Sequence, residues 1–284
     1  MIETTEAYKE KVNDSVREWR ARVKIYFDGD ESPPVTFDEE RANNMLLLEE
    51  SQGESGNPLG LVSGNEFTLT LNNDDRRFTP SNIDSPYYGK LKPGTKLEPY
   101  LLLKTGYDEI LEEDVYEEIP LGVFRTGEFD APSDNVEATV VCYDVLFEIG
   151  EKRMPKLAIA KNTTIAGMFR RLFEALGLVE NVDFTISSGL DSPVAIGWYP
   201  TGKVRTSLQY LAIAGNCSVT ANRYGVIQVR SNFREGEQDF TWTDQNQIVK
   251  VLNPLNYRET FHKVNVDYHS PYIASEKEIL FQHN

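Results

Sequence analysis

Alternating apolar and polar residues limit the fold of this chain more than any other feature of its sequence. Phe67, Leu69 and Leu71 are separated by single threonines, so their side chains point to one face of an extended strand. The same period of two, or a short apolar run, recurs between turns rich in Gly, Pro, Asn and Asp. These runs predict further strands at 21–27, 97–104, 119–124 and 135–147. The first half of the chain therefore predicts an antiparallel β domain with long loops.

The periodicity becomes helical in the middle of the chain. Between Ile165 and Leu176 the apolar residues recur at spacings of three and four, behind a threonine suited to cap a helix. A second helix is predicted over 203–214, with Thr201 as its N-cap. Five further strands are predicted at 217–222, 225–231, 240–242, 250–257 and 260–268. The predicted fold class is therefore mainly β with an α/β insertion.

Acidic residues outnumber basic residues by a wide margin. The 284 residues include 29 Lys and Arg and 45 Asp and Glu, which gives a formal net charge of −16. That excess argues against a nucleic-acid-binding protein that relies on Lys and Arg to neutralise phosphates, and against a polybasic membrane-surface protein. An apolar fraction of 40% is typical of a globular protein with a core. No run approaches the ~18 apolar residues of a spanning helix, so no membrane segment is predicted.

Motifs that would support catalysis or cofactor binding are incomplete. The segment from Gly197 to Lys203 matches the first part of a phosphate-binding loop. Val204 stands where a Ser or Thr would bind Mg²⁺, and Pro200 removes a backbone N–H that would contact phosphate. The three histidines and two cysteines do not follow the spacing of metal sites, and the cysteines are expected to be buried thiols. We therefore predict no catalytic residue, no metal site, no cofactor and no enzyme activity.

A long segment without strand or helix periodicity follows the strand at 66–71. Residues 76–96 carry three prolines and two glycines. Long loops of this kind are uncommon in compact domains and tend to be functional. Tyr87 and Tyr88 either anchor a protein interface, where tyrosine is enriched, or pack onto the barrel from which the loop arises. A second loop, acidic and solvated, is predicted at 112–118.

The long segment resembles the start of bacteriophage tail hub proteins, which include baseplate hubs of contractile tails and the N-terminal part of tail-associated lysins. In that family a strand ends in an Asn/Asp turn, and a Phe-x-Pro element and a Gly-Lys-Leu-Lys-Pro-Gly element follow. Here these are residues 72–75, 78–80 and 89–94. Weaker elements continue in the same order to about residue 232. The candidate interface or structural residues are Phe78, Pro80, Tyr87, Tyr88, Gly89, Lys90, Pro93 and Gly94.

The resemblance implies antiparallel, barrel-like domains of the tail-tube type. Residues 1–145 would form one such domain with long loops, 146–232 an α/β domain with two helices, and 233–284 part of a second tube-like domain. Hubs of this family form homotrimers, whose pseudo-sixfold ring joins a sixfold tube to a threefold tip. The implied place is the virion tail, after synthesis in the cytoplasm of the host bacterium. The implied partners are tail-tube and distal tail proteins and tip or fibre proteins, with DNA only as transiting cargo.

Two other classes of function stay open at the level of sequence. A receptor- or carbohydrate-binding module of the tail tip would show an exposed aromatic platform. The chain would otherwise be the non-catalytic N-terminal part of a tail-associated lytic enzyme. An active site within the chain itself would need a polar pocket with convergent acids or histidines.

Overall fold

The computed structural model describes residues 4–38, 41–48, 60, 62–110, 112–131, 136–191 and 194–232. The strands predicted at 240–242, 250–257 and 260–268, and the segment 233–284 as a whole, lie outside the described residues. The helices are α1 (Glu6–Lys11), α2 (Val145–Glu151), α3 (Ile165–Ala175) and α4 (Val204–Ala214), with a short 3-10 helix at Ser188–Leu190. None of the described helices is long and apolar enough to span a bilayer.

The strands dominate the described part of the chain, which confirms the predicted fold class, mainly β with an α/β insertion. They are β1 (Trp19–Ile25), β2 (Val35–Asp38), β3 (Ala42–Leu48), β4 (Glu66–Asn72), β5 (Lys96–Asp108), β6 (Glu113–Pro120), β7 (Phe124–Asp130), β8 (Glu137–Asp144), β9 (Ala160–Thr164), β10 (Phe184–Ile186), β11 (Val194–Gly197), β12 (Cys217–Ala221) and β13 (Ile227–Ser231).

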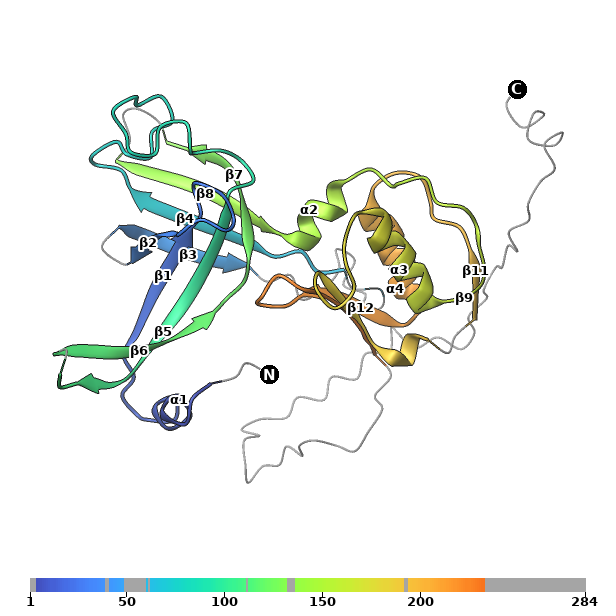
Figure 1. Ribbon diagram of the computed structural model, residues 1–284, viewed down its shortest axis with the longest axis horizontal. Helices are drawn as coiled ribbons and strands as arrows, with labels where there is room; N and C mark the ends of the chain where they lie inside the picture. The colour runs from blue at the N-terminus through green and yellow to red at the C-terminus, as the bar shows by residue number, and fades with distance from the viewer. Residues whose placement is uncertain are drawn as a thin grey trace, which may run out of the picture.

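The largest sheet is antiparallel and curled into a half-barrel (Figure 1). Its strand order is β2-β1-β5-β7-β8-β4-β3, with β6 paired to β5 outside this path. β2 and β3 are consecutive in the chain yet lie at the two ends of this order, so the sheet has to curl to let a short connection join them. The Arg41 N–H donates to the Asp38 carbonyl (2.9 Å), and the Asn72 N–H donates to the Arg41 carbonyl (2.7 Å). These bonds hold the two ends of the sheet near each other.

Alternate residues of the strands fill the inside of the half-barrel. Phe67, Leu69 and Leu71 of β4 are buried, while the threonines between them are only half-buried. The same alternation buries Val23 and Ile25 of β1. The strand predicted at 66–71 is therefore confirmed, together with the face that it turns inward.

β5 belongs both to the half-barrel and to a projecting hairpin. Along one edge it pairs with β1. Along the other edge it pairs with β7 at Lys96 and Leu97, and then with β6 from Tyr100 to Asp108. The sheet divides where β7 leaves β5, and the β5–β6 hairpin extends away from the half-barrel, at the lower left of Figure 1.

The acidic run at 112–118 lies mostly in strand β6 and not in the solvated loop that the sequence predicted. Basic residues on neighbouring strands pair with two of its five acids. Glu118 accepts hydrogen bonds from Arg22 (2.8 Å) and Lys24 (2.6 Å) of β1, and Asp114 pairs with Lys104 of β5 (2.7 Å). Arg22 and Lys24 are more than ninety residues away in the sequence, so the local pattern did not reveal them.

The strand predicted at 119–124 is the boundary between two strands. β6 ends at Pro120, which has no N–H to donate to a ladder, and β7 begins at Phe124. Between them the Leu121 N–H donates to the Pro99 carbonyl (3.0 Å). A Cβ on Gly122 would lie 2.4 Å from the Phe124 ring, so the chain turns at a position where only glycine fits.

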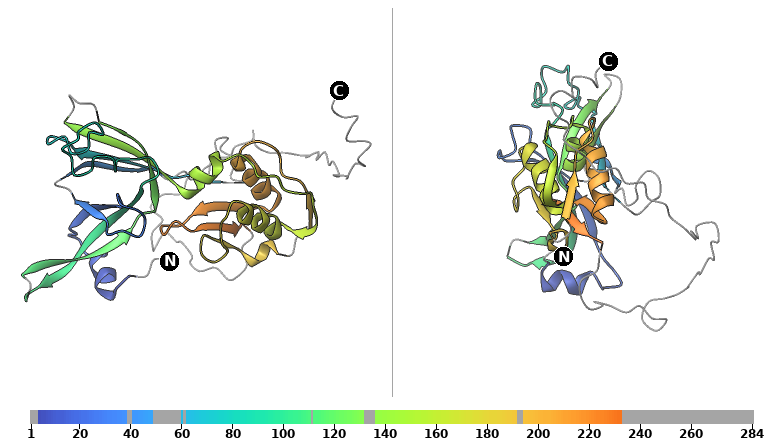
Figure 2. Two further views of the ribbon diagram at one scale, coloured as in Figure 1. Left: turned by 45° about the horizontal axis from the view of Figure 1, so that its top comes forward. Right: turned by 90° about the vertical axis from the view of Figure 1, so that its right-hand side faces the viewer.

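A second hydrophobic core is built around α3 and α4. Phe169, Leu172 and Phe173 of α3 are fully buried. The helices accompany a three-stranded sheet of order β10-β13-β12 and a two-stranded sheet of β11 and β9. The ring of Phe173 lies 4.8 Å from that of Phe184 in β10, which joins helix and sheet. The left view of Figure 2 shows this α/β unit beside the half-barrel, and the right view shows it in front of the half-barrel along the long axis.

The strand predicted at 135–147 ends early, at Asp144. The Asp144 carboxylate accepts hydrogen bonds from the Phe147 N–H (2.8 Å) and the Asn65 N–H (2.9 Å). The first bond caps α2, so residues 145–147 become helical. Burial raises the pKa of the Asp144 carboxyl group, although these backbone bonds act in the opposite direction. One side chain thus connects the end of β8, the start of α2 and the segment before β4.

The predicted helix ends are correct for α3 and wrong for the start of α4. Thr164 Oγ1 accepts a hydrogen bond from the Gly167 N–H (2.9 Å), and Gly177 beyond the helix has a φ of +84°. α4 begins after Lys203, whose side chain makes no capping hydrogen bond. Thr201 is not its N-cap, because Thr201 lies in an exposed turn two residues earlier.

Candidate interface loop

The loop between β4 and β5 begins with a buried asparagine. Asn73 is only 1% exposed. Its Nδ2 donates to Thr79 Oγ1 (3.0 Å), and its Oδ1 accepts from the Phe78 N–H (2.9 Å). Its own N–H donates to the Val136 carbonyl (2.6 Å), next to the start of β8. The first turn of the loop is therefore folded around one amide side chain.

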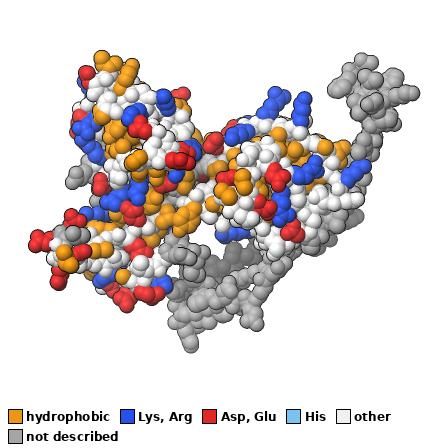
Figure 3. All heavy atoms as spheres, viewed as in Figure 1, with side chains coloured by type: hydrophobic (Ala, Val, Ile, Leu, Met, Phe, Trp, Pro, Cys, Tyr) orange, Lys and Arg blue, Asp and Glu red, His pale blue; other side chains and the backbone are white. Residues whose placement is uncertain are grey.

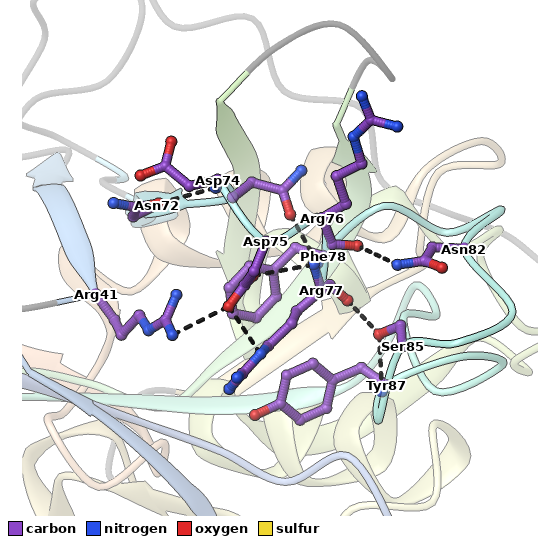
Figure 4. A network of polar contacts seen from close by, with 11 residues as sticks. Arg41, Asn72, Asp74, Asp75, Arg76, Arg77, Phe78, Asn82, Ser85 and Tyr87 are labelled. Carbon is purple, nitrogen blue, oxygen red and sulfur yellow. Dashed lines mark hydrogen bonds and ion pairs between the residues drawn. The ribbon is translucent and has the colours of Figure 1, made fainter.

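Charged and hydroxyl side chains connect this first turn to its surroundings (Figure 4). The Asp75 carboxylate pairs with Arg41 (3.1 Å), just before β3, and with Arg77 (2.8 Å). The Ser85 hydroxyl donates to the Arg77 carbonyl and accepts from the Tyr87 N–H (3.0 Å). The bond between Ser85 and Arg77 thus joins the two halves of the loop directly.

Two of the candidate residues, Phe78 and Tyr87, face inward and stack. Their ring centroids are 5.4 Å apart and the rings are nearly parallel. Tyr87 also stacks on Phe27 (4.7 Å), and Phe78 meets Phe37 edge-on (5.5 Å). Burial raises the pKa of Tyr87 above its usual value. This cluster attaches the loop to β2 and to the end of β1, which is the packing alternative that the sequence left open for Tyr87.

The Gly-Lys-Leu-Lys-Pro-Gly element is shaped by its two glycines. Gly89 and Gly94 have φ values of +71° and +84°, a region that favours glycine. Lys90 between them pairs with Asp28 (2.8 Å) in the turn after β1. The Gly94 N–H donates to the Thr126 carbonyl (2.7 Å) of β7. The element therefore lies over the rim of the half-barrel, bonded to the turn after β1 and to Thr126 of β7.

The remaining candidate residues face outward. Tyr88 is 53% exposed, and Pro80 and Pro93 are exposed as well. Ile83, a residue that the sequence reasoning did not single out, is an exposed apolar side chain in the same loop. The loop thus has an inner side that is fixed to the barrel and an outer side that presents apolar and aromatic groups.

Sequence reasoning also missed the residues that hold the loop in place. Asn73, Asp75 and Ser85 make the polar contacts, and Thr126 supplies the distant anchor. The first three carry a local signal, because Asn, Asp and Ser are the side chains that bond backbone groups in turns. Thr126 carries none, because it is brought to the loop only by the pairing of β7.

The described residues offer contact surface more than reactive groups. Cys142 and Cys217 are buried, as predicted, and burial raises the pKa of both thiols to about 12. Both are therefore protonated and unreactive near neutral pH. Within the described ranges, no three His, Cys, Asp or Glu side chains are grouped so that they could hold a metal ion.

Comparison with solved structures finds tail proteins. The structure is similar to a 43 kDa tail protein of prophage MuSo2 from Shewanella oneidensis, with a TM-score of 0.47 and 10% identity over 74% of this chain and 54% of that one. A tail protein from Neisseria meningitidis MC58 gives a TM-score of 0.46 and 8% identity over 74% of this chain and 50% of that one. The chain therefore spans about half the length of these two proteins.

A chain in a Francisella PdpA–VgrG complex is similar with a TM-score of 0.44 and 12% identity, over 76% of this chain and 31% of that one. No protein-family model matches the sequence, and no curated protein is similar to it.

Proposed function

We propose that this chain is a structural hub of a bacteriophage tail or of a phage-tail-like particle. In this role it joins the tail tube to the tip or baseplate and forms part of the conduit for DNA. The observation that supports the proposal best is the loop at 73–95. It combines the sequence elements that resemble tail hubs with a rigid attachment to the rim of a curled antiparallel sheet, and it turns Tyr88 and Pro93 outward.

The proposal also assigns an oligomeric state to the protein and a role to each part of the chain. Residues 1–145 act as a tube-like domain, 146–232 as an α/β domain, and 233–284 as part of a second tube-like domain of a homotrimer. The partners are the tail tube, distal tail proteins and tip or fibre proteins. Residues 1–144 carry 14 Lys and Arg against 31 Asp and Glu, a formal net charge of −17. Carboxylates that line a conduit would repel DNA and keep it from adhering during ejection.

A single exposed residue provides the test of the loop. We expect Tyr88→Asp to abolish incorporation of the protein into tail particles without changing its melting temperature, because Tyr88 is 53% exposed and carries no core packing. Tyr210→Asp on α4 is the matched control, because Tyr210 is 59% exposed. Normal particles from the Tyr88 variant would contradict the assignment of the loop as an interface.

The location of the protein tests the hub role itself. Immunogold labelling of particles from cells that make this protein should mark the distal end of a tail. Gold that marks no particle, with the protein free in the lysate, would overturn the proposal.

A further inference from the structure

The tip of the β5–β6 hairpin exposes apolar side chains on a projection from the half-barrel. Ile110 in the turn is 92% exposed, and Tyr107 of β5 and Val115 of β6 are also exposed. Single exposed apolar residues are ordinary, but here three lie close together on one projecting element. Tyr107 pairs with Asp114 and Val115 with Gly106, so Tyr107 and Val115 point to opposite faces of the hairpin and Ile110 lies at its end. The outer edge of β6 pairs with no other described strand. The described part of the chain therefore leaves both the apolar tip and the outer edge of the hairpin uncovered.

Several side-chain bonds connect the base of this hairpin to neighbouring segments of the chain. Lys104 of β5 pairs with Asp114 of β6 (2.7 Å) and with Glu18 (3.3 Å). Tyr116 donates a hydrogen bond to Glu18 (2.6 Å), and the Thr5 N–H at the start of α1 donates to Glu117 (3.0 Å). A projection that is ordered before binding loses little conformational entropy when it docks.

The charge at the tip indicates what the hairpin contacts. Glu109, Glu112 and Glu113 are exposed, and none of them has a basic partner among the described residues. Each acid lies within three residues of Ile110. The complementary surface would be apolar or aromatic at its centre and basic around it, since interfaces pair opposite potentials.

The α/β unit of the same chain carries such a surface. Residues 145–232 contain 10 Lys and Arg against 6 Asp and Glu, a formal net charge of +4 in a chain of −16. Arg153, Lys156 and Lys161 are exposed and have no acidic partner in the described ranges. In the space-filling view, blue side chains are numerous over this unit, with red ones among them, and red side chains lie at the tip of the hairpin (Figure 3).

An exposed aromatic residue lies within this basic surface. Gly197 of β11 is the Cα partner of Ala160, which places Trp198 beside the strand that begins Ala160-Lys161. Trp198 is exposed. The Met154 N–H donates to the Gly202 carbonyl (2.7 Å), so Arg153 lies next to the segment that follows Trp198. We call Arg153, Lys156, Lys161 and Trp198 the basic face.

We propose that the hairpin tip of one copy docks on the basic face of a second copy. The two surfaces lie toward opposite ends of the long axis of the molecule (Figures 1 and 3), so one copy does not cover its own tip. Contact between two different surfaces is heterologous, and repetition of it closes a ring where the rotation allows. This inference rests on the proposed function, because it names the surfaces through which the hub would associate with itself.

Charge reversal on each surface tests the contact. We expect Glu109→Lys with Glu112→Lys and Glu113→Lys to weaken self-association at least about tenfold, measured by analytical ultracentrifugation at low salt. Arg153→Glu with Lys156→Glu and Lys161→Glu should have the same effect. A chain that carries all six changes should associate again, because both charges are then reversed. The matched control reverses Glu31, Glu128 and Asp130, exposed acids that lie outside the hairpin.

Ile110→Asp tests the apolar part of the contact. Because Ile110 is almost fully exposed, this substitution should not affect folding. It should weaken association, while Val136→Asp, at another exposed apolar residue, should not. The proposal is overturned if the charge-reversed variants associate as strongly as the control. It is also overturned if the chain with all six substitutions does not regain self-association, or if the unaltered chain is monomeric at its highest soluble concentration. Incorporation of the protein into tails despite these results would leave the hub role standing and remove only this contact.

Discussion

Asn73 shows how much one buried polar side chain can organise. Both ends of its amide are bonded, to Thr79 and to the Phe78 N–H, and the residue is nearly inaccessible to water. A buried amide with satisfied partners defines one conformation, whereas exposed pairs such as Lys9 with Glu6 contribute little to stability. The geometry of the interface loop therefore depends on a residue that does not itself reach the surface.

Replacement of this asparagine should destabilise the protein measurably. We expect Asn73→Ala to lower the free energy of unfolding by about 1–3 kcal/mol, because the Phe78 N–H and the Thr79 hydroxyl lose their partner in a buried site. Urea denaturation followed by circular dichroism measures the change. Asn13→Ala is the control, since Asn13 is exposed and its side-chain Nδ2 donates to the Lys9 carbonyl (2.7 Å). An equal effect of the two substitutions would contradict the argument.

Glu118 predicts a dependence of stability on pH. Its partial burial would raise the pKa of the carboxyl group, but hydrogen bonds from Lys24 and Arg22 outweigh this and hold that pKa below its usual value. A carboxyl group whose pKa is lower in the folded state stabilises the protein above its unfolded pKa and loses that contribution as the pH falls below it. Glu118→Gln should therefore be less stable than the unaltered protein at pH 7, and the difference should shrink toward pH 3. Urea denaturation measures the free energy of unfolding of both proteins. A difference between them that stays constant from pH 7 to pH 3 would contradict the assigned role of Glu118.

At the scale of elements, α3 and α4 have the same length and different beginnings. Thr164 caps α3 with its side chain, whereas Lys203 before α4 offers no side-chain acceptor. α4 is helical because Val204, Leu208 and Leu211 are buried in the second core. Packing of one apolar face therefore replaces a cap, as it does for most helices in proteins.

The two threonines before these helices form a matched pair for a test. Thr164→Ala should cost about 1 kcal/mol of stability, because the Gly167 N–H loses its acceptor. Thr201→Ala should change stability by less than about 0.5 kcal/mol, as is usual for exposed positions without a special contact. Thermal denaturation of both variants decides the point, and a larger effect at Thr201 would contradict the assigned helix start.

At the scale of the whole molecule, the half-barrel and the α/β unit each have a core. The two clusters of buried residues that the structure describes have no member in common. Cys142 lies in the first core and Cys217 in the second. The units also contact each other, for example through the bridge of Val62 to Val219 and the bond of Arg223 to the Pro120 carbonyl.

The two thiols can report on the two cores separately. With a pKa of about 12 and no exposure, neither should react with a thiol reagent at pH 8 under native conditions. In rising urea we expect Cys142, observed in Cys217→Ala, and Cys217, observed in Cys142→Ala, to become reactive at different midpoints, because the two thiols lie in separate hydrophobic cores that can open separately. Coincident midpoints would mean that the cores unfold as one.

Local patterns were enough to predict some elements and not others. The strand at 66–71, the helix over 165–176 and the buried cysteines depend on residues a few positions apart, so they could be predicted from the sequence. The motif residues of the loop could also be selected from the sequence, since their resemblance is a property of order along the chain, and their role as an interface stays a prediction. The inward stacking of Phe78 and Tyr87 was left open, because it depends on Phe27 and Phe37.

The sequence by itself determined the mainly β class, the two longer helices and the excess of acidic residues. Hydrophobic periodicity, helix-capping residues and charge can all be identified from residues that are close together in the sequence. Only the tertiary structure decided that the acidic run is a strand, that Asp144 ends β8 and starts α2, and which side of the loop faces outward. Each of these outcomes depends on a partner distant in the sequence: Lys24 for Glu118, Asn65 for Asp144, and the rim of the half-barrel for the loop. Each burial or ion pair involves two residues that are far apart in the sequence, and a local sequence pattern contains only one of the two.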